Sequence, residues 1–453
     1  MGSEERSPIV PEKGKQGEEA LWQRHGAERG VWSERMLEAL ETGIKGNRWF
    51  SLIDKVYADR TLELAWEKVR ANAGSCGIDR VTVALFGKDS KSRLLAVKEQ
   101  LRKGEYQPRP AKRVWIPKAG NGQMRPLGIP IVKDRIVEAA VKMVIEPIFE
   151  REFASQSYGF RPGRGCKEAL RQVEGLLKSG YTHVLDVDIK GYFDSIPHEK
   201  LMARTGERIA DGRVLKLIES MLKRGVLEEM KGWQPSEKGT PQGGVISPLL
   251  ANIYLNPLDW KLSGLGIEVV RYADDIVVLC QRKEEVEKAK QAVEAWMEES
   301  GLKLHPEKTR IVDMNEPEGS FDFLGYRFKR SRRGRIVRLV RPQSVQKLKE
   351  KLRGLTKRNN GHCMGAIIQK INPILRGWFN YFKQACRTQH QELDKWTRGR
   401  LRSILRRRQR RKGKANGLDH QRWPNRYFEA LGYFSLNSAR ERFTTNLRKG
   451  VTC

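Results

Sequence analysis

Two acidic strand ends, far apart in the sequence, constrain the fold of this chain more than any other feature. Residues 267–280 read as two apolar strands around an Ala-Asp-Asp turn at 273–275, a pattern that indicates a buried hairpin. Residues 182–189 alternate like a half-buried strand that ends near Asp186 and Asp188. An Asp-Asp pair alone could be an ordinary turn, because Asp favours turns. Because a second strand also ends in aspartates, the pattern instead favours a site at which three carboxylates converge.

Converging carboxylates of this kind are typical of metal-dependent phosphoryl transfer. Hard divalent cations prefer oxygen ligands, and two such ions about 3.5 to 4 Å apart can activate a 3′-hydroxyl and stabilise a leaving pyrophosphate. Strand alternation places Asp186 and Asp188 on the same face. The spacing therefore leaves open which of these two residues binds metal.

The positive charge of the chain lies almost entirely in its C-terminal part. There are 87 Lys and Arg against 55 Asp and Glu, a formal net charge of +32. From Ser331 to Cys453 the counts are 32 basic and 6 acidic residues, a net charge of +26, so the first 330 residues carry only +6. So large a surplus repels itself unless a polyanion neutralises it. The sequence therefore predicts a polyanionic partner for the C-terminal part.

Aromatic residues are mixed with these cations. Cationic side chains that contact phosphates and aromatic rings that stack on bases are typical of nucleic-acid binding. A membrane-binding segment would instead show one amphipathic basic helix. We therefore expect nucleic acid, and no membrane, as the partner. The alternative is that the rings form a helical core and the cations a solvated face. The rings are Trp378, Phe379, Tyr381, Phe382, Trp396, Trp423, Tyr427 and Phe428.

Composition excludes several other classes of protein. No apolar run approaches the roughly 18 residues of a membrane helix, and the acidic N-terminus lacks the apolar stretch of a signal peptide. The six cysteines form no Cys-x-x-Cys pair, so neither a disulfide framework nor a zinc ribbon is indicated. A chain of 453 residues exceeds the size of one hydrophobic core. We expect a soluble cytoplasmic protein with two or three domains.

Periodicity predicts an α+β sheet domain followed by helices. A β-hairpin is expected over residues 113–130, with its turn at 119–122. From about residue 417 the sequence is basic, aromatic and expected to be less regular. The expected helices span residues 32–40, 62–70, 132–149, 214–223, 247–260, 283–300, 345–357, 366–386 and 391–411.

Longer motifs resemble those of group II intron-encoded reverse transcriptases and maturases, from about Leu37 onward. Tyr-Ala-Asp-Asp at 272–275 is similar to the family's catalytic motif, and Gly-Thr-Pro-Gln-Gly-Gly at the start of 239–255 to its glycine-led motif. The resemblance implies a right-hand polymerase of the α+β class, with fingers and palm on an antiparallel sheet and an α-helical thumb. Other similar segments lie at 116–118, 125–130, 157–164, 301–309, 323–325 and, for the maturase signature, 371–382.

The resemblance also implies a division of the chain. We expect an N-terminal extension at 1–60, reverse transcriptase fingers and palm at 61–330, a thumb or maturase domain (domain X) at 331–412, and a short basic DNA-binding region at 413–453. Many members of the family end in an HNH endonuclease domain with zinc-binding Cys and His pairs. No such domain is expected here, because the last segment lacks these ligands. Priming from a nick or from nascent strands at a replication fork is expected instead.

The resemblance assigns roles at the catalytic site. Asp188, Asp274 and Asp275 would bind two Mg²⁺ ions, since the family pattern of Asp, four residues, an aromatic and Asp fits Asp188 and not Asp186. Phe193 would lie under the sugar and select dNTPs over NTPs. The other expected nucleotide contacts are Lys118, Arg125, Gln242 and Lys308, of which Lys308 is either a general acid for pyrophosphate or a plain surface lysine.

Contacts with nucleic acid follow from the same resemblance. Phe323, Leu324 and Gly325 would hold the primer strand. Arg161 and Arg164 would contact the template backbone, with ordinary turn charges as the alternative. RNA is expected to bind at Arg376, Trp378, Arg406, Arg407 and Arg408.

The function implied by the resemblance is an RNA-directed DNA polymerase that binds its own intron RNA, assists splicing and supports intron mobility by target-primed reverse transcription. Two alternatives stay open: a protein that acts mainly as an RNA-binding splicing maturase, and a free-standing relative in phage defence or DNA repair. The expected partners are group II intron RNA, an RNA template with a DNA primer, target DNA and dNTPs. A monomer or homodimer in the bacterial cytoplasm, associated with the nucleoid, is expected.

Overall fold

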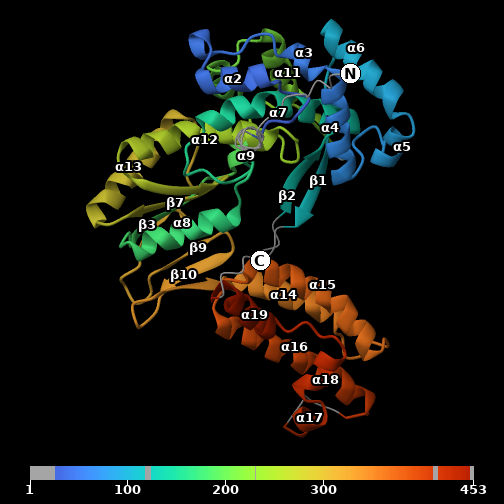
Figure 1. Ribbon diagram of the computed structural model, residues 1–453, viewed down its shortest axis with the longest axis vertical. Coiled ribbons are helices and arrows are strands. Elements are labelled where there is room, and N and C mark those ends of the chain that lie inside the picture. The colour runs from blue at the N-terminus through green and yellow to red at the C-terminus, as the bar shows by residue number, and fades with distance from the viewer. Residues whose placement is uncertain (1–25, 118–123, 230, 412–416, 449–453) are drawn as a thin grey trace, which may run out of the picture. The chain divides into compact units, whose positions relative to one another are not determined.

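The computed structural model describes residues 26–117, 124–229, 231–411 and 417–448. The chain divides into two compact units, one ending at Ile311 and one beginning at Val312. Each unit is described by itself (Figure 1). The second unit thus begins before residue 331, where the thumb was expected to start. The expected turn at 119–122 and Lys118 lie outside the described residues. The assignment of ranges to fingers, palm, thumb and DNA-binding region stays a prediction.

Two buried helices form the core of the first unit. α7 (Val132–Glu152) and α12 (Ser247–Gly264) bury side chains on nearly every face, as helices in the interior of a large domain do. α4 (Asp59–Asn72) packs along α7, and α10 (His198–Gly206) packs along α12. The helices expected around 62–70, 132–149 and 247–260 are confirmed.

The sheet that carries the acidic residues has the strand order β6-β7-β3-β8. Its strands are β3 (His183–Asp188), β6 (Glu268–Tyr272), β7 (Asp275–Cys280) and β8 (Arg310–Asp313). β7 is antiparallel to both β3 and β6, which confirms the antiparallel arrangement expected from the sequence. α13 (Lys283–Glu299) runs along β7 and β3 (Figure 1).

A second sheet in the same unit has the order β2-β1-β4-β5. The expected hairpin is present, because β1 (Ala111–Pro117) pairs antiparallel with β2 (Met124–Ile129). β1 also pairs in parallel with β4 (Val226–Glu228), which forms a hairpin with β5 (Gly232–Gln234). The sequence pattern did not indicate β4 and β5, because strands of three residues are too short to show a period.

Shorter elements complete the first unit. They are α2 (Glu34–Thr42), the 3-10 helix η1 (Lys45–Asn47), α3 (Ile53–Val56), α5 (Val83–Gly87), α6 (Ser90–Lys103), α8 (Cys166–Lys178), α9 (Tyr192–Ser195) and α11 (Gly212–Lys223).

The second unit combines a small antiparallel sheet with helices. Its strands are β9 (Ser320–Phe323), β10 (Tyr326–Arg330) and β11 (Ile336–Val340), in the order β11-β10-β9. The long helices that follow confirm those expected from the sequence. The sequence predicted helical structure from residue 331 onward. That boundary is wrong, because strand β11 lies after residue 331. The long helices are α14 (Pro342–Leu355), α15 (Met364–Phe382) and α16 (Arg387–Arg408).

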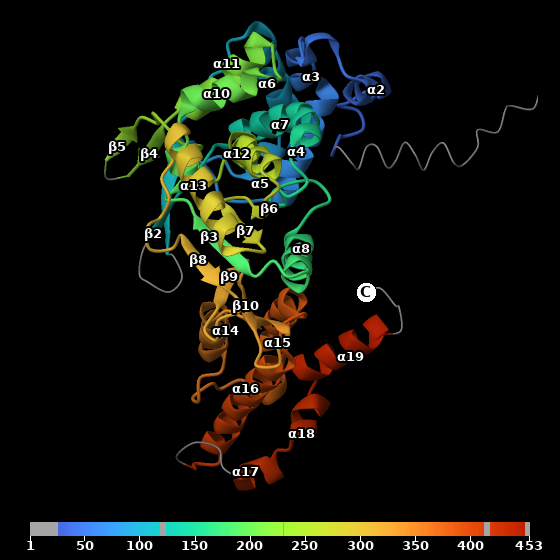
Figure 2. The same cartoon turned by 90° about the vertical axis from the view of Figure 1, so that its left-hand side faces the viewer.

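The C-terminal segment, expected to be less regular, contains three helices: α17 (Gly417–Arg422), α18 (Asn425–Ala430) and α19 (Leu436–Arg448). α19 packs against α15 and α16 (Figure 2). The buried Asp394 of α16 accepts hydrogen bonds from the backbone N–H groups of Leu436 at 3.0 Å and Asn437 at 2.9 Å. These bonds satisfy donors at the start of α19. A cap from so distant a residue leaves no local sequence signal.

Across the described ranges, no helix is both long and apolar enough to cross a bilayer.

Candidate active site

Strand register brings three aspartates to one end of the first sheet. Asp188 is the last residue of β3 and lies opposite Asp275, the first residue of β7. Asp274 precedes it in a turn that contains two residues, Ala273 and Asp274. Asp275 is therefore a strand residue, whereas the sequence pattern predicted that it belongs to the turn.

Asp186 has different surroundings. It lies two residues back along β3, opposite Val277, and its Oδ2 is 3.7 Å from Arg310 Nε. Alternation alone could not separate Asp186 from Asp188. The pairing of β3 with β7 places only Asp188 beside the Asp274–Asp275 pair.

Carboxylate oxygens are the ligands that hard divalent cations prefer. Burial raises the pKa of the Asp274 carboxyl, and the nearby Asp188 carboxylate raises it further, because negative charges crowd each other here. Lys308 Nζ lies 3.3 Å from Asp188 Oδ2 and balances part of this charge. Among the described residues, no group of three or more His, Cys, Asp or Glu side chains is arranged to hold a metal ion. The metal role of the three aspartates therefore stays a prediction, and a cation there would compete with Lys308 for Asp188.

The loop that starts at Gly239 lies between α9 and β2. The backbone N–H of Thr240 donates to Phe193 O at 2.7 Å, and the N–H of Gly128 donates to Gln242 O at 2.7 Å. Gly243 has φ of +109°, and a Cβ there would lie 2.5 Å from Gly128 O. Glycine is required at this position because a side chain would collide with the β2 backbone.

A chain of side-chain hydrogen bonds crosses this loop. Arg125 Nε on β2 donates to Gln242 Oε1 at 2.6 Å, and Gln242 Nε2 donates to Asp194 Oδ2 at 2.8 Å. Three residues far apart in sequence thus hold one another in place. Phe193, beside Asp194 on α9, is buried and packs edge-on against Tyr192 at 5.6 Å between ring centroids.

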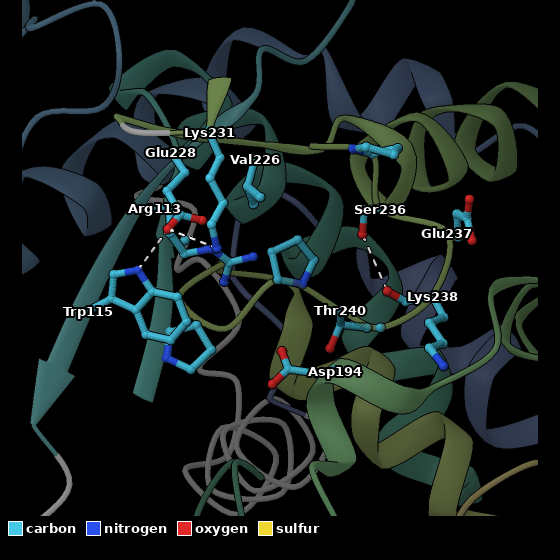
Figure 3. Close-up of a pocket in the computed structure, with 15 residues that line it drawn as sticks. Arg113, Trp115, Asp194, Val226, Glu228, Lys231, Ser236, Glu237, Lys238 and Thr240 are labelled. Carbon is cyan, nitrogen blue, oxygen red and sulfur yellow. Dashed lines mark hydrogen bonds and ion pairs between the residues drawn. The ribbon is translucent and has the colours of Figure 1, made fainter. Parts of the chain in front are cut away.

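A cavity of about 460 Å³ adjoins Asp194. Figure 3 shows Arg113, Trp115 and Glu228 on one side of it, and Asp194, Thr240 and Lys238 on the other. Trp115 Nε1 donates to Glu228 Oε1 at 3.2 Å. The Thr240 hydroxyl is buried and has no hydrogen-bond partner among the residues that the structure describes.

Comparison with known proteins shows the family to which the chain belongs. Residues 116–328 match Reverse transcriptase (RNA-dependent DNA polymerase), and residues 345–423 match Group II intron, maturase-specific domain. Protein YkfC of Escherichia coli (strain K12) is 35% identical over 322 residues, which cover 62% of this chain and 83% of YkfC. The chain belongs to the group II intron reverse transcriptase and maturase family.

Other similar proteins are matched over shorter regions. Group II intron-encoded protein LtrA of Lactococcus lactis subsp. cremoris is 40% identical over 198 residues, which cover 43% of this chain and 32% of LtrA. A chain of the solved "Partial Cas6-RT-Cas1--Cas2 complex" is 26% identical, with a TM-score of 0.36, and the match covers 57% of this chain and 43% of that chain. So low a TM-score adds nothing to the assignment. Family membership makes this protein an RNA-directed DNA polymerase and implies divalent metal ions, a nucleic-acid template, dNTPs and intron RNA as its ligands.

In this reverse transcriptase, Arg161 is an interior residue. Its side chain is 3% exposed, and Nε and Nη2 donate to the Glu150 carboxylate at 3.0 and 2.7 Å. Nη1 donates to the carbonyl groups of Ala154 and Ser157. The expected contact of Arg161 with the template backbone does not fit this structure, because the guanidinium is buried and its donors are already used.

Arg164 is half-buried. Its Nη1 donates to Ser155 O at 2.6 Å, and its guanidinium lies 5.7 Å from the centroid of the Tyr158 ring. A template contact by Arg164 stays a prediction.

The residues expected to hold the primer form the turn between β9 and β10. Leu324 and Gly325 have φ of +49° and +81°, and Phe323 pairs with Tyr326 on either side of them. The Phe323 side chain is buried. Tyr381 Oη donates to Leu324 O at 2.8 Å. Leu324 and Gly325 are half-buried, and a primer contact by this turn stays a prediction.

The aromatic residues of the maturase region mostly form its core. Phe379, Phe382, Trp423 and Phe428 are buried, so the alternative interpretation as helical core holds for these four rings. Trp378 is half-buried, and its ring centroid lies 4.9 Å from that of Phe382. A ring packed in this way presents only part of its surface to RNA.

The five expected RNA contacts are not equally accessible. Arg407 and Arg408 are exposed at the end of α16. Arg376 is exposed on α15, with its guanidinium 4.8 Å from the centroid of the Phe434 ring. Arg406 is half-buried and pairs with Asp419 at 2.8 Å.

Several buried charged residues near the site were not identified from the sequence. Arg271 pairs with Asp259, and Arg224 pairs with Glu138, which also accepts hydrogen bonds from the N–H groups of Val245 and Ile246. A charged residue inside an otherwise apolar run was the available signal. That signal could not reveal the partner, because the partners lie on other elements.

Proposed function

We propose that this reverse transcriptase is encoded by a group II intron, binds the RNA of that intron, assists its splicing and supports its insertion into DNA by target-primed reverse transcription. The observation that carries the proposal is the presence of both matched regions in one chain, the polymerase at 116–328 and the maturase-specific domain at 345–423. The reverse transcriptase match by itself says nothing of splicing, whereas the second match is to a domain of group II intron maturases. The combination favours a protein that copies an RNA and also assists its splicing.

In the proposed polymerase reaction, Asp188, Asp274 and Asp275 hold two Mg²⁺ ions. When bound, these ions activate the primer 3′-hydroxyl and stabilise the leaving pyrophosphate. The ammonium group of Lys308, 3.3 Å from Asp188, is the proposed donor of a proton to that pyrophosphate.

The nucleotide is held by residues around the glycine-led loop. Arg125 and Lys118 bind the triphosphate through charge-assisted hydrogen bonds, and Gln242 lines the pocket. The Phe193 ring lies under the sugar and leaves no room for a 2′-hydroxyl, so dNTPs are selected. The hydrogen bonds that link Arg125, Gln242 and Asp194 support the placement of Arg125 and Gln242 in one pocket.

The second unit is the proposed site of intron RNA binding. Arg376, Arg407 and Arg408 expose their cations, and residues 413–453 are the proposed contact with target DNA. Phosphate contacts release counterions, so affinity should fall steeply with salt.

Primer extension on an RNA template with dNTPs and Mg²⁺ tests the polymerase site. The variant with Asp274→Ala and Asp275→Ala should lose extension. Asp186→Ala is the matched control, because it removes a carboxylate from the same sheet at a position paired with Arg310, and it should keep most of the activity. Extension by the double variant at the wild-type rate would overturn the assignment.

A splicing assay with intron RNA tests the maturase role. The Asp274→Ala, Asp275→Ala variant should still promote splicing, whereas Arg407→Ala with Arg408→Ala should weaken RNA binding. The slope of log affinity against log salt should fall by about 0.7 to 0.9 per lost phosphate contact. Lys283→Ala with Lys288→Ala on α13 is the charge-matched control, since both residues are exposed on the first unit. Equal splicing by wild type and the arginine variant at limiting protein would contradict the proposal.

The DNA around the gene separates an intron-encoded protein from a free-standing relative. A folded intron with a domain V hairpin is expected there. Absence of an intron would favour the alternative role in phage defence or DNA repair.

A further inference from the structure

The turn that carries the catalytic aspartates has a backbone conformation that its residue does not favour. Ala273 has φ of +58°, in the left-handed region that suits glycine better than a residue with a Cβ atom. Such a conformation persists only where neighbouring groups hold it in place. The position of the Asp274 and Asp275 carboxylates depends on this turn.

Arg271 is the group that reaches the turn from inside. Its side chain is fully buried, and Nη1 donates to Ala273 O at 3.0 Å. The same nitrogen donates to Asn252 Oδ1 at 2.8 Å. Nε and Nη2 donate to the Asp259 carboxylate at 2.8 and 2.6 Å, and that side chain is 1% exposed. The guanidinium is thus fixed by α12 while it holds the carbonyl group next to Asp274.

A loop closes the other side of the turn. Asn252 Nδ2 donates to Gly159 O at 2.8 Å, and Tyr158 N–H donates to Arg271 O at 2.8 Å. A Cβ on Gly159 would lie 2.9 Å from the carbonyl carbon of Tyr272, so the loop backbone packs directly against the turn. Asn252 therefore joins the loop and Arg271 in one buried network.

A buried ion pair is a poor source of stability, since replacing both partners by apolar residues is often neutral or stabilising. A contact with the Ala273 carbonyl group, in contrast, cannot be supplied by an apolar side chain. We propose that Arg271 is a positioning residue, which holds Ala273 in its left-handed conformation so that the Asp274 and Asp275 carboxylates face Asp188 and bind a divalent cation. The inference rests on the proposed metal role of these three aspartates.

The test uses full-length protein with Arg271→Met and Asp259→Leu combined, so that no lone charge is left buried. Two readouts need no turnover: the Mn²⁺ dissociation constant from electron paramagnetic resonance, and the hydrogen exchange rates of the amides in residues 272–276. We expect the dissociation constant to rise about tenfold, the lower range for loss of a group that orients metal ligands, with faster exchange in the turn. Adding Ala273→Gly should recover part of the affinity, because glycine takes positive φ without a Cβ clash.

The buried pair Arg224 and Glu138 provides the matched control. Arg224→Met with Glu138→Leu removes an ion pair whose side chains are each 1% exposed and which makes no hydrogen bond to Ala273 or to the loop at Gly159, and it should leave Mn²⁺ affinity unchanged. Equal losses in both pairs would mean general destabilisation and would overturn the inference. Wild-type affinity and exchange in the Arg271 double variant would overturn it as well.

Two further comparisons keep the result interpretable. Should the double variant fail to fold, Arg271→Lys keeps the charge but cannot donate to Asp259, Asn252 and Ala273 in the same planar geometry, and it should show the same loss of Mn²⁺ affinity. Should Asp274→Ala with Asp275→Ala bind Mn²⁺ as tightly as wild type, the proposed metal role itself fails. If Asp274→Ala with Asp275→Ala loses Mn²⁺ affinity while the Arg271 variants bind Mn²⁺ as tightly as wild type, the positioning role alone fails.

Discussion

Gln242 Nε2 donates a hydrogen bond to Asp194 Oδ2 at 2.8 Å and thereby fixes which way the Gln242 amide points. Its Oε1 is then free to accept from Arg125 Nε at 2.6 Å. Asp194 can therefore influence the proposed contact between Arg125 and the triphosphate, a contact that Asp194 does not make itself.

Replacing Asp194 should weaken nucleotide binding more than catalysis. In Asp194→Leu the Gln242 amide loses its acceptor, so Arg125 is less well oriented and the KM for dNTPs should rise roughly 3- to 10-fold, in line with one lost hydrogen bond at an exposed site. Asp194→Asn keeps an acceptor oxygen and serves as the control, with a smaller change. Steady-state primer extension measures both. Equal KM values in the two variants would contradict this orienting role.

Shortening Phe193 should reduce the selection against ribonucleotides. Phe193→Val removes the ring proposed to lie under the sugar, and the preference for dNTPs over NTPs should fall by roughly 100-fold, the scale on which pockets reject one added hydroxyl. Single-nucleotide incorporation with each substrate measures the ratio of the two kcat/KM values. Extension with dNTPs should continue, which separates loss of selection from loss of fold. An unchanged ratio would remove Phe193 from the proposed sugar contact.

Asp134 should make stability depend on pH. Burial raises the pKa of its carboxyl to about 6, above an unfolded value of about 3.9. The protonated form thus contributes stability that is present in full below about pH 4 and lost as pH rises through about 6. Between pH 4.5 and 7, the unfolding free energy of wild type should fall by about 2 kcal/mol relative to Asp134→Asn, which does not titrate. Urea unfolding at each pH measures this difference, and a constant difference would exclude a raised pKa.

Asp394 should hold the C-terminal helix on the second unit. Besides the start of α19, it accepts hydrogen bonds from Tyr433 Oη at 2.9 Å and Ser435 Oγ at 2.7 Å. Asp394→Ala leaves these donors buried without a partner, and we expect a loss of about 3 kcal/mol. Limited proteolysis should then cleave between α16 and α19 sooner than in wild type. Asp394→Asn retains one acceptor and should be intermediate, whereas equal proteolysis of all three proteins would show that the cap is dispensable.

The main secondary structure could be predicted because each long element has its own period. β3 shows apolar alternation, β6 and β7 contain continuous apolar runs, and α13 shows an amphipathic stripe, all within a few residues of sequence. The antiparallel pairing of β6 with β7 followed from the short turn between them. β4 and β5 are too short to carry such a pattern, and the pairing of β4 with β1 joins residues 115 positions apart, such as Ala111 and Val226.

The proposed catalytic aspartates and the glycine-led loop could be singled out from the sequence because residue types and their spacing are visible there. Which side chains are accessible to solvent could not be predicted. Arg161 and Arg164 have the same charge and lie three residues apart, yet Arg161 is buried on Glu150 while Arg164 is only half-buried. Whether an arginine faces solvent or an interior carboxylate depends on a partner from another element.

The sequence by itself determined which chemical groups this reverse transcriptase has: a pair of adjacent aspartates after an apolar strand, a third at the end of another strand, and a strongly basic C-terminal part. The tertiary structure decided which of these groups meet. It placed Asp188 rather than Asp186 beside Asp275, buried Arg271 against the turn at Ala273 and Asp274, and joined α19 to α16 through Asp394. Local periodicity reports only the backbone of neighbouring residues, whereas contacts between distant residues exist only once the chain has packed.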